Sequence, residues 1–125
     1  MSAQKIMYVV TQSPYSNSAG QEALDALLIG AAFEQEVSVL FIHNGVFQLK
    51  NQQSTVHESS EISSIKQFTK TYKALQDFGV ENVYVDSLSM ASRGLDESQL
   101  MMSVTLLDSE QVSSLLAQQF RVFTF

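Results

Sequence analysis

Side chains that could carry out chemistry are sparse in this 125-residue chain, which has two histidines and no cysteine. His43 and His57 lie far apart in the sequence. Glu58 and Glu61 follow the second histidine, but no pair of ligands shares a helical face at a spacing typical of metal sites. We therefore expect no metal site and interpret His43 as a histidine that is hydrogen-bonded at a sheet edge. Without a thiolate the chain has no sulfur nucleophile of its own.

Motifs that bind phosphate or hydrolyse esters are missing as well. The loop after the first predicted strand has no glycine until Gly20, so it contains neither a P-loop nor a dinucleotide fingerprint. No Gly-x-Ser-x-Gly occurs. The run Ser16, Asn17, Ser18 precedes a predicted helix, where free amides could hold an anion, but we interpret it as the helix cap. We expect no cofactor, and catalysis by this chain alone would rest on scattered Asp, Glu and Tyr side chains.

Composition narrows the classes of partner. Hydrophobic residues make up 45% of the chain and charged residues 16%, against roughly 25% charged in typical soluble domains, and a surface with so few charges is often covered by other chains. The formal net charge of −6 lacks the basic footprint of a nucleic-acid binder. No charged leader precedes Ile6, and no apolar run approaches membrane-spanning length. We expect a soluble cytoplasmic protein that contacts neither nucleic acid nor membrane directly.

Strand and helix patterns alternate along the chain. We predict strands at Ile6–Val10, Val37–Ile42, Val83–Val85, Met101–Leu107 and Phe120–Phe125. We predict helices from the cap Ser18 through Ala31, over Ile62–Leu75 with Gly79 as the C-cap, over about one turn at Ser87–Ser92, and from the cap Asp108 through Leu116. The polar stretch from Lys50 to Ser60 is predicted to be a surface loop. Strands separated by helices imply crossover connections. We therefore predict a single domain over residues 1–125, of three-layer α/β/α class, with a mainly parallel sheet of about five strands.

A candidate interface follows the second predicted strand. Its residues are Asn44, Gly45, Val46, Phe47 and Leu49. Open α/β sheets bind their ligands outside the carboxyl ends of the strands, and no predicted helix covers the three apolar side chains here. We therefore expect Val46, Phe47 and Leu49 to lie largely in an interface between subunits.

The last predicted strand is apolar on both faces. Its period of two places Phe120 and Val122 on one face and Phe123 and Phe125 on the other. A strand of this kind should not lie exposed at a sheet edge. We expect helices of this domain, or a partner subunit, to cover both of its faces.

Four blocks, in order, resemble the TusC/DsrF family, whose members are subunits of the sulfur-relay complexes TusBCD and DsrEFH. The blocks are Ala19–Leu28, Val39–Leu49, Tyr72–Leu75 with Gly79-Val80, and Ser87-Leu88 with Arg93-Gly94-Leu95. They span nearly the whole chain. In the family an aspartate usually precedes the glycine of the second block, whereas this chain has Asn44, which keeps a side chain tolerant of turn geometry but has no carboxylate.

The resemblance implies a defined role. In complexes of the TusBCD type, persulfide sulfur passes along cysteine carriers toward 2-thiolation of the wobble uridine of certain tRNAs, and the reactive cysteine belongs to the TusD/DsrE partner. The resemblance thus implies a non-catalytic subunit with TusB-like and TusD-like partners in a heterohexamer. The absence of cysteine agrees with this, because a persulfide carrier needs a sulfur atom to load.

Two alternatives stay open. One is a DsrF-type subunit that serves sulfur oxidation. The other is a free-standing small-molecule or nucleotide-binding α/β domain that uses the loops after the first and second strands.

Overall fold

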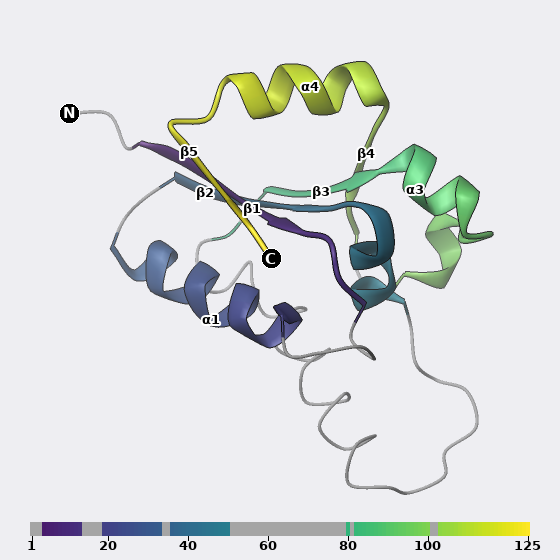
Figure 1. Cartoon of the computed structure of the whole chain (residues 1–125), viewed down its shortest axis with the longest axis horizontal. Helices are drawn as coiled ribbons and strands as arrows, with labels where there is room; N and C mark the ends of the chain where they lie inside the picture. Colours follow the sequence, from purple (N-terminus) through teal and green to yellow (C-terminus); the bar gives the residue numbers. More distant parts are fainter. Residues whose placement is uncertain (1–3, 14–18, 34–35, 51–79, 81, 101–102) are drawn as a thin grey trace, which may run out of the picture.

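The computed structural model describes residues 4–13, 19–33, 36–50, 80, 82–100 and 103–125 (Figure 1). Three predictions lie outside these residues: the helix over Ile62–Leu75 with its cap Gly79, nearly all of the loop from Lys50 to Ser60, and the cap at Ser18. Among the residues described, no helix is both long and apolar enough to cross a membrane.

One five-stranded parallel sheet organises the chain. Its strands are β1 (Lys5–Val10), β2 (Glu36–Phe41), β3 (Asn82–Asp86), β4 (Thr105–Leu107) and β5 (Arg121–Thr124). They lie in the order β4-β3-β2-β1-β5, and every neighbouring pair is parallel. The predicted α/β class and parallel sheet are confirmed. The predicted strand Met101–Leu107 is too long at its start, because among its described residues, 103–107, the last three alone pair with β3.

Helices lie on both faces of the sheet. The helix α1 (Ala19–Ala32) covers one face and α4 (Ser109–Ala117) covers the opposite one, while α3 (Ser87–Ser92) follows β3 at its carboxyl end (Figure 1). Two short 3₁₀ helices complete the described elements, η1 (His43–Leu49) and η3 (Glu97–Gln99). The three-layer arrangement agrees with the prediction, and the bounds of α3 are those predicted.

The core is split between the two faces because strand side chains alternate. Toward α1, the strands contribute Tyr8, Val10, Val39, Phe41 and Val85 to a cluster that also includes Leu27 of α1. Toward α4, a smaller cluster holds Met7, Val9, Leu40, Leu107 and Val112. Burial on both faces explains why β1 and β2 read as nearly continuous apolar runs.

A reciprocal hydrogen-bond pair fixes the start of α4. The backbone N–H of Gln111 donates to Asp108 Oδ1 at 2.8 Å, and the backbone N–H of Asp108 donates to Gln111 Oε1 at 2.9 Å. This is the capping box predicted from the sequence. It holds the buried Val112 over the sheet.

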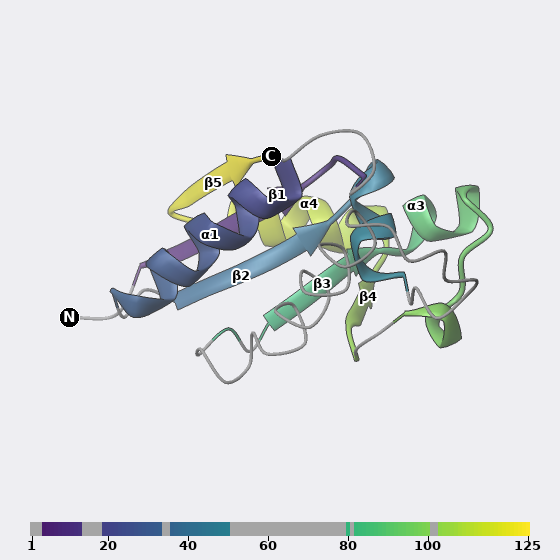
Figure 2. The same cartoon turned by 90° about the horizontal axis from the view of Figure 1, so that it is seen from below.

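The last strand lies at an edge of the sheet, next to β1 (Figure 2). Val122 aligns with Met7, on the α4 face, and Phe123 aligns with Tyr8, on the α1 face. The predicted alternation is confirmed. Helices of this domain leave Val122 and Phe123 42% and 41% exposed, so they do not cover both faces of β5, and the other half of the expectation, cover by a partner subunit, stays a prediction. β5 lies at an edge of the described sheet, so β1 is the one strand that flanks it.

Candidate functional site

The candidate site lies where β2 and β3 end, at the carboxyl edge of the sheet. After β2 the chain turns into η1. The turn is held by a bond from the Ile42 N–H to the Val10 carbonyl (3.1 Å) and one from the Gly45 N–H to the Ile42 carbonyl (3.0 Å). A Cβ atom on Gly45 would lie 1.8 Å from the Val10 carbonyl oxygen. Only glycine therefore lets η1 pack directly against the end of β1.

The apolar residues of η1 point into this chain's own core. The side chains of Val46 and Leu49 are 0% exposed and belong to the α1-face cluster. This corrects the expectation that they contact another subunit, because they have no surface left to offer. Both side chains pack in one cluster with Leu27 of α1, Phe41 of β2 and Met90 of α3. Asn44 is exposed and Phe47 is half-buried, so these two remain available to a partner, whereas Gly45 is buried.

A chain of buried polar groups fastens η1 to α3. The backbone N–H of His43 donates to Ser89 Oγ at 2.8 Å, and the Ser89 hydroxyl donates to Asp86 Oδ2 at 2.5 Å. The same Asp86 oxygen accepts the Ser89 backbone N–H at 3.1 Å and so caps α3. Asp86 and Ser89 are both buried. Their hydrogen bonds offset the cost of removing a carboxylate and a hydroxyl from water.

His43 carries the one positive φ angle among the described residues other than glycine, 55°. Histidine is among the residues that tolerate this region. The bond to Ser89 holds the backbone in that conformation while the His43 side chain stays exposed. The predicted hydrogen bond of His43 at the sheet edge exists, but the backbone makes it.

Arg93 forms the outer part of the same assembly. Its Nε donates to Asn44 Oδ1 at 2.9 Å and one terminal nitrogen donates to the Ser89 carbonyl at 3.2 Å. Arg93 thus links η1 to the end of α3 a second time. Asn44 serves here as a neutral acceptor, a role that does not need the family's carboxylate. Leu88 of α3 is also exposed.

The chemistry open to this cluster is limited. The Ser89 proton is donated to Asp86, and the Ser89 oxygen accepts from a backbone amide, so the hydroxyl is occupied by structural bonds. Within the described residues no group of three possible metal ligands comes together. Since the chain has no cysteine, the arrangement cannot hold a persulfide. What it offers is a polar surface of His43, Asn44 and Arg93, held by the bonds from His43 to Ser89 and from Arg93 to Asn44.

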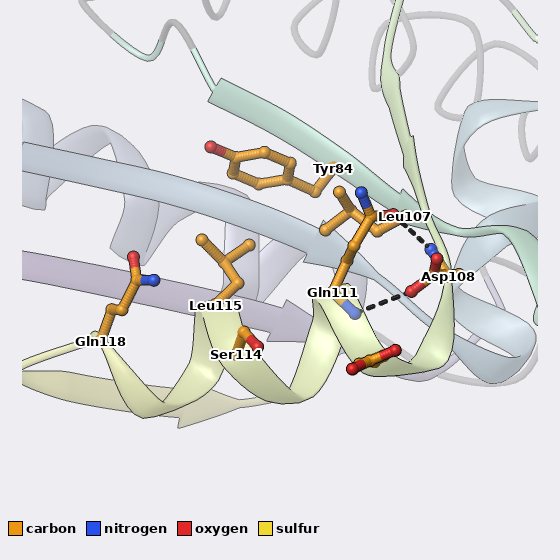
Figure 3. Close-up of a pocket in the computed structure, with 8 residues that line it drawn as sticks. Tyr84, Leu107, Asp108, Gln111, Ser114, Leu115 and Gln118 are labelled. Atoms are coloured by element: carbon orange, nitrogen blue, oxygen red, sulfur yellow. Dashed lines mark hydrogen bonds between the residues drawn. The ribbon is translucent and has the colours of Figure 1, made fainter.

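Away from this surface, a hollow of about 390 Å³ lies between α4 and the sheet (Figure 3). Tyr84 and Leu107 form its floor, and Gln111, Ser114, Leu115 and Gln118 line its helical side. Its best-placed polar groups, Asp108 and Gln111, bond to each other in the capping box. Asp108 and Gln111 are therefore already committed to the helix start, while Tyr84, Glu110, Ser114 and Gln118 also line the hollow.

The Asp86–Ser89 pair was not singled out from the sequence. Its signal is an Asp at the end of an apolar strand with a Ser three residues later, which is the spacing of a helix N-cap. The bond from His43 to Ser89 leaves no such trace, because the two residues are distant in sequence and meet only when β2 and β3 pair.

Known proteins resemble this chain over nearly its whole length. The model of the DsrE/DsrF-like family matches residues 4–125. The chain belongs to this family. A protein of Allochromatium vinosum named intracellular sulfur oxidation protein DsrF is 36% identical, and the match covers 97% of this chain and 96% of that protein. A protein of Pseudomonas aeruginosa named TusC homolog is 35% identical, with 98% of both chains covered.

Among solved structures, the ychN protein from E. coli has the same fold. The TM-score is 0.75 at 18% identity, with 98% of this chain and 99% of that chain covered. A likeness at this identity speaks for the fold alone. The resemblance to TusC and DsrF proteins stated from the sequence is confirmed.

Proposed function

We propose that this chain is a non-catalytic subunit of a heteromeric sulfur-relay complex of the TusBCD type, in which it positions a cysteine-bearing subunit. The observation that carries the proposal is the near full-length match to a TusC homolog and to DsrF in a chain with no cysteine. Relay of persulfide sulfur needs a thiolate at each carrier. The sulfur-carrying cysteine therefore belongs to a partner, and the sulfur passes toward 2-thiolation of tRNA wobble uridine.

The docking surface we propose is the rim of the carboxyl-edge site, formed by the exposed Asn44 and the half-buried Phe47 and Arg93. Arg93 and Asn44 hold each other in place, and the buried Asp86–Ser89 pair fixes the backbone beneath them. A rigid rim loses little conformational entropy when a partner binds. The partners in this proposal are a TusB-like and a TusD-like subunit, with two copies of each chain in a heterohexamer.

The first experiment follows sulfur. The chain and its TusB-like and TusD-like partners are incubated with a cysteine desulfurase and radiolabelled cysteine, together and separately. We expect the partners to copurify with this chain, and covalent label to appear on the cysteine-bearing partner and never on this chain. Failure of the partners to bind, or label on this chain, would refute the proposal.

The second experiment tests the rim. Asn44→Arg places a second cation beside Arg93 on an exposed surface, so the folded chain should persist while assembly with the partners is lost. Phe47→Asp should act in the same direction. Glu97→Arg, at an exposed position of η3, is the matched control with a larger charge change. Unchanged assembly of both rim variants would show that the partners bind elsewhere.

A DsrF-type role in sulfur oxidation is the second candidate, favoured by the relative named intracellular sulfur oxidation protein DsrF. The two roles differ in the effect of deletion. Loss of thiolated wobble uridine in a deletion strain supports the tRNA pathway, and normal thiolation with impaired oxidation of stored sulfur supports the other.

A further inference from the structure

The free edge of β5 is an unprotected strand edge. Among the strands that the structure describes, β5 pairs with β1 alone, so its outer side presents backbone groups without a partner strand. Proteins usually guard such edges with lysines, prolines or very short strands. Residues 120–125 contain one charge, Arg121, and no proline. Phe120, Val122 and Phe123 are all substantially exposed.

An apolar groove of about 270 Å³ lies along this edge, between β5 and α1. Tyr8 forms its floor and stacks on Phe123, with ring centroids 5.6 Å apart, and on Phe125, at 6.0 Å. Ile29 of α1 forms the other wall and is 60% exposed. The apolar surface at this edge therefore extends beyond the strand itself.

Hydrogen bonds reveal which backbone groups face outward. The Phe125 N–H donates to the Val9 carbonyl and the Phe125 carbonyl accepts from the Thr11 N–H, both at 2.8 Å. Both groups of Phe125 thus point to β1. Because strand residues alternate, those of Phe123 also point to β1, while the N–H and C=O groups of Val122 and Thr124 point to the free edge.

We propose that a second copy of this chain pairs with β5 across this edge, antiparallel, around a two-fold axis at Phe123. Val122 of each copy then exchanges backbone hydrogen bonds with Thr124 of the other, which uses the outward groups of both strands. Phe123 faces Phe123 of the second copy. The two sheets become one continuous sheet. A two-fold axis normal to the sheet keeps each face on its own side, so apolar side chains meet apolar side chains.

Charge is compatible with this register. Arg121 faces Phe125 of the second copy, an arrangement that favours cation–π contact, and no acidic residue lies in 120–125. A register centred on Arg121 would oppose like charges. The net charge of −6 therefore does not oppose contact at this edge.

A stable dimer needs more buried area than the strand pair alone supplies. Stable interfaces bury about 1,200–2,000 Å² in total, more than a four-residue strand pair provides. The second copy brings its own strand and its own helix layers, so it covers Phe123 and Ile29 on one face and Val122 on the other. The pairing does not rest on the proposed function, because it requires only this chain.

The first test measures mass. Sedimentation equilibrium of the isolated full chain should give twice 13.9 kDa at high concentration. Val122→Asp should raise the dissociation constant on the order of 100-fold, because it buries a charge in the pairing. The matched control is Leu106→Asp, at a 38% exposed position of the opposite edge strand β4, which should leave the dimer intact. A chain that is monomeric alone and masked at β5 only by a different subunit would overturn the proposal.

The second test measures register and uses the absence of native cysteine. Residues facing each other at a non-hydrogen-bonded antiparallel position have Cα atoms about 4.5 Å apart, within the range of about 4.4–6.8 Å that a disulfide spans. Oxidised Phe123→Cys should therefore give a covalent dimer, and Val122→Cys alone should not. Should Phe123→Cys fail to fold, a mixture of Val122→Cys and Thr124→Cys chains gives the same readout, since these positions face each other. Cross-linking no greater than that of Leu88→Cys would overturn the pairing.

Discussion

Two short segments of this chain, η1 and β5, differ in how far their apolar side chains are buried. In η1, Val46 and Leu49 are completely buried, whereas in β5, Val122 and Phe123 keep about two fifths of their surface exposed. η1 is enclosed by the end of β1 below it and by α3 beside it. β5 has a neighbour on one side only. An apolar segment shows that cover is needed, but the position of the segment in the sheet decides whether its own chain supplies it.

The largest difference in the free energy of unfolding is expected between Val46→Asp in η1 and Val122→Asp in β5. Val46→Asp puts a carboxylate into the core without a partner, at a cost of several kcal/mol, which approaches the 5–15 kcal/mol that holds a typical domain together. Val122→Asp should change the free energy of unfolding of the monomer by about 1 kcal/mol. Chemical denaturation monitored by circular dichroism checks both. Equal losses would show that β5 is part of the core after all.

The glycines sharpen the comparison at the level of the backbone. Gly45→Ala should destabilise by about 3 kcal/mol or more, because the added Cβ meets the Val10 carbonyl, a backbone atom that cannot easily move. Gly94 has a φ of 67° and open space around it. Gly94→Ala should therefore cost only about 1–2 kcal/mol. Thermal melting of both variants measures the difference, and similar melting temperatures would contradict the close approach of η1 to β1.

Removal of the Ser89 hydroxyl, which joins η1 to α3, should lower the free energy of unfolding moderately. Ser89→Ala leaves the His43 N–H without its acceptor. It also removes one of the two hydrogen bonds that Asp86 Oδ2 accepts, while the bond from the Ser89 backbone N–H remains. A loss of about 1–3 kcal/mol is expected. Ser92→Ala, exposed on the same helix, should stay within about 0.5 kcal/mol. Faster amide hydrogen exchange across His43–Leu49 in Ser89→Ala alone would localise the effect.

The smallest effect concerns Tyr8, beneath β5. Burial raises the pKa of the Tyr8 phenol above its usual 10.0. The unfolded chain therefore ionises first, so stability is intact below pH 10.0 and declines as the pH rises above it. Phe123→Ala should bring the pKa of Tyr8 back toward 10.0, because one of the stacked rings is lost. Ultraviolet titration against Tyr8→Phe isolates this group, and an unchanged pKa would show that β5 does not shield it.

Much of the fold could be predicted because its signals are local. The apolar runs of β1 and β2 and the Asp108–Gln111 cap each arise within a few residues, and local steric and hydrogen-bond preferences act over that distance. Within its described residues, 103–107, the predicted strand is longer than β4, because an apolar stretch is recognisable without showing how many of its residues find a partner strand.

The candidate site was predicted only in part, since its residues come together from different segments. Asn44 and Phe47 were recognised as surface of the loop after β2, and they remain candidates for partner contact. Arg93, Asp86 and Ser89 join them only after β3 is laid beside β2. No spacing in the sequence records contacts between segments that far apart.

By itself the sequence determined the alternating strands and helices, the resemblance to its family and the exclusion of persulfide chemistry. Periodicity, short sequence blocks and the absence of a cysteine thiol can be read without any long-range contact. Only the tertiary structure decided that Val46 and Leu49 are core and that Val122 and Phe123 are edge. Both pairs are equally apolar, and burial depends on which strands become neighbours. That order is set by the crossovers of the whole chain, which place β1 in the sheet between β2 and β5.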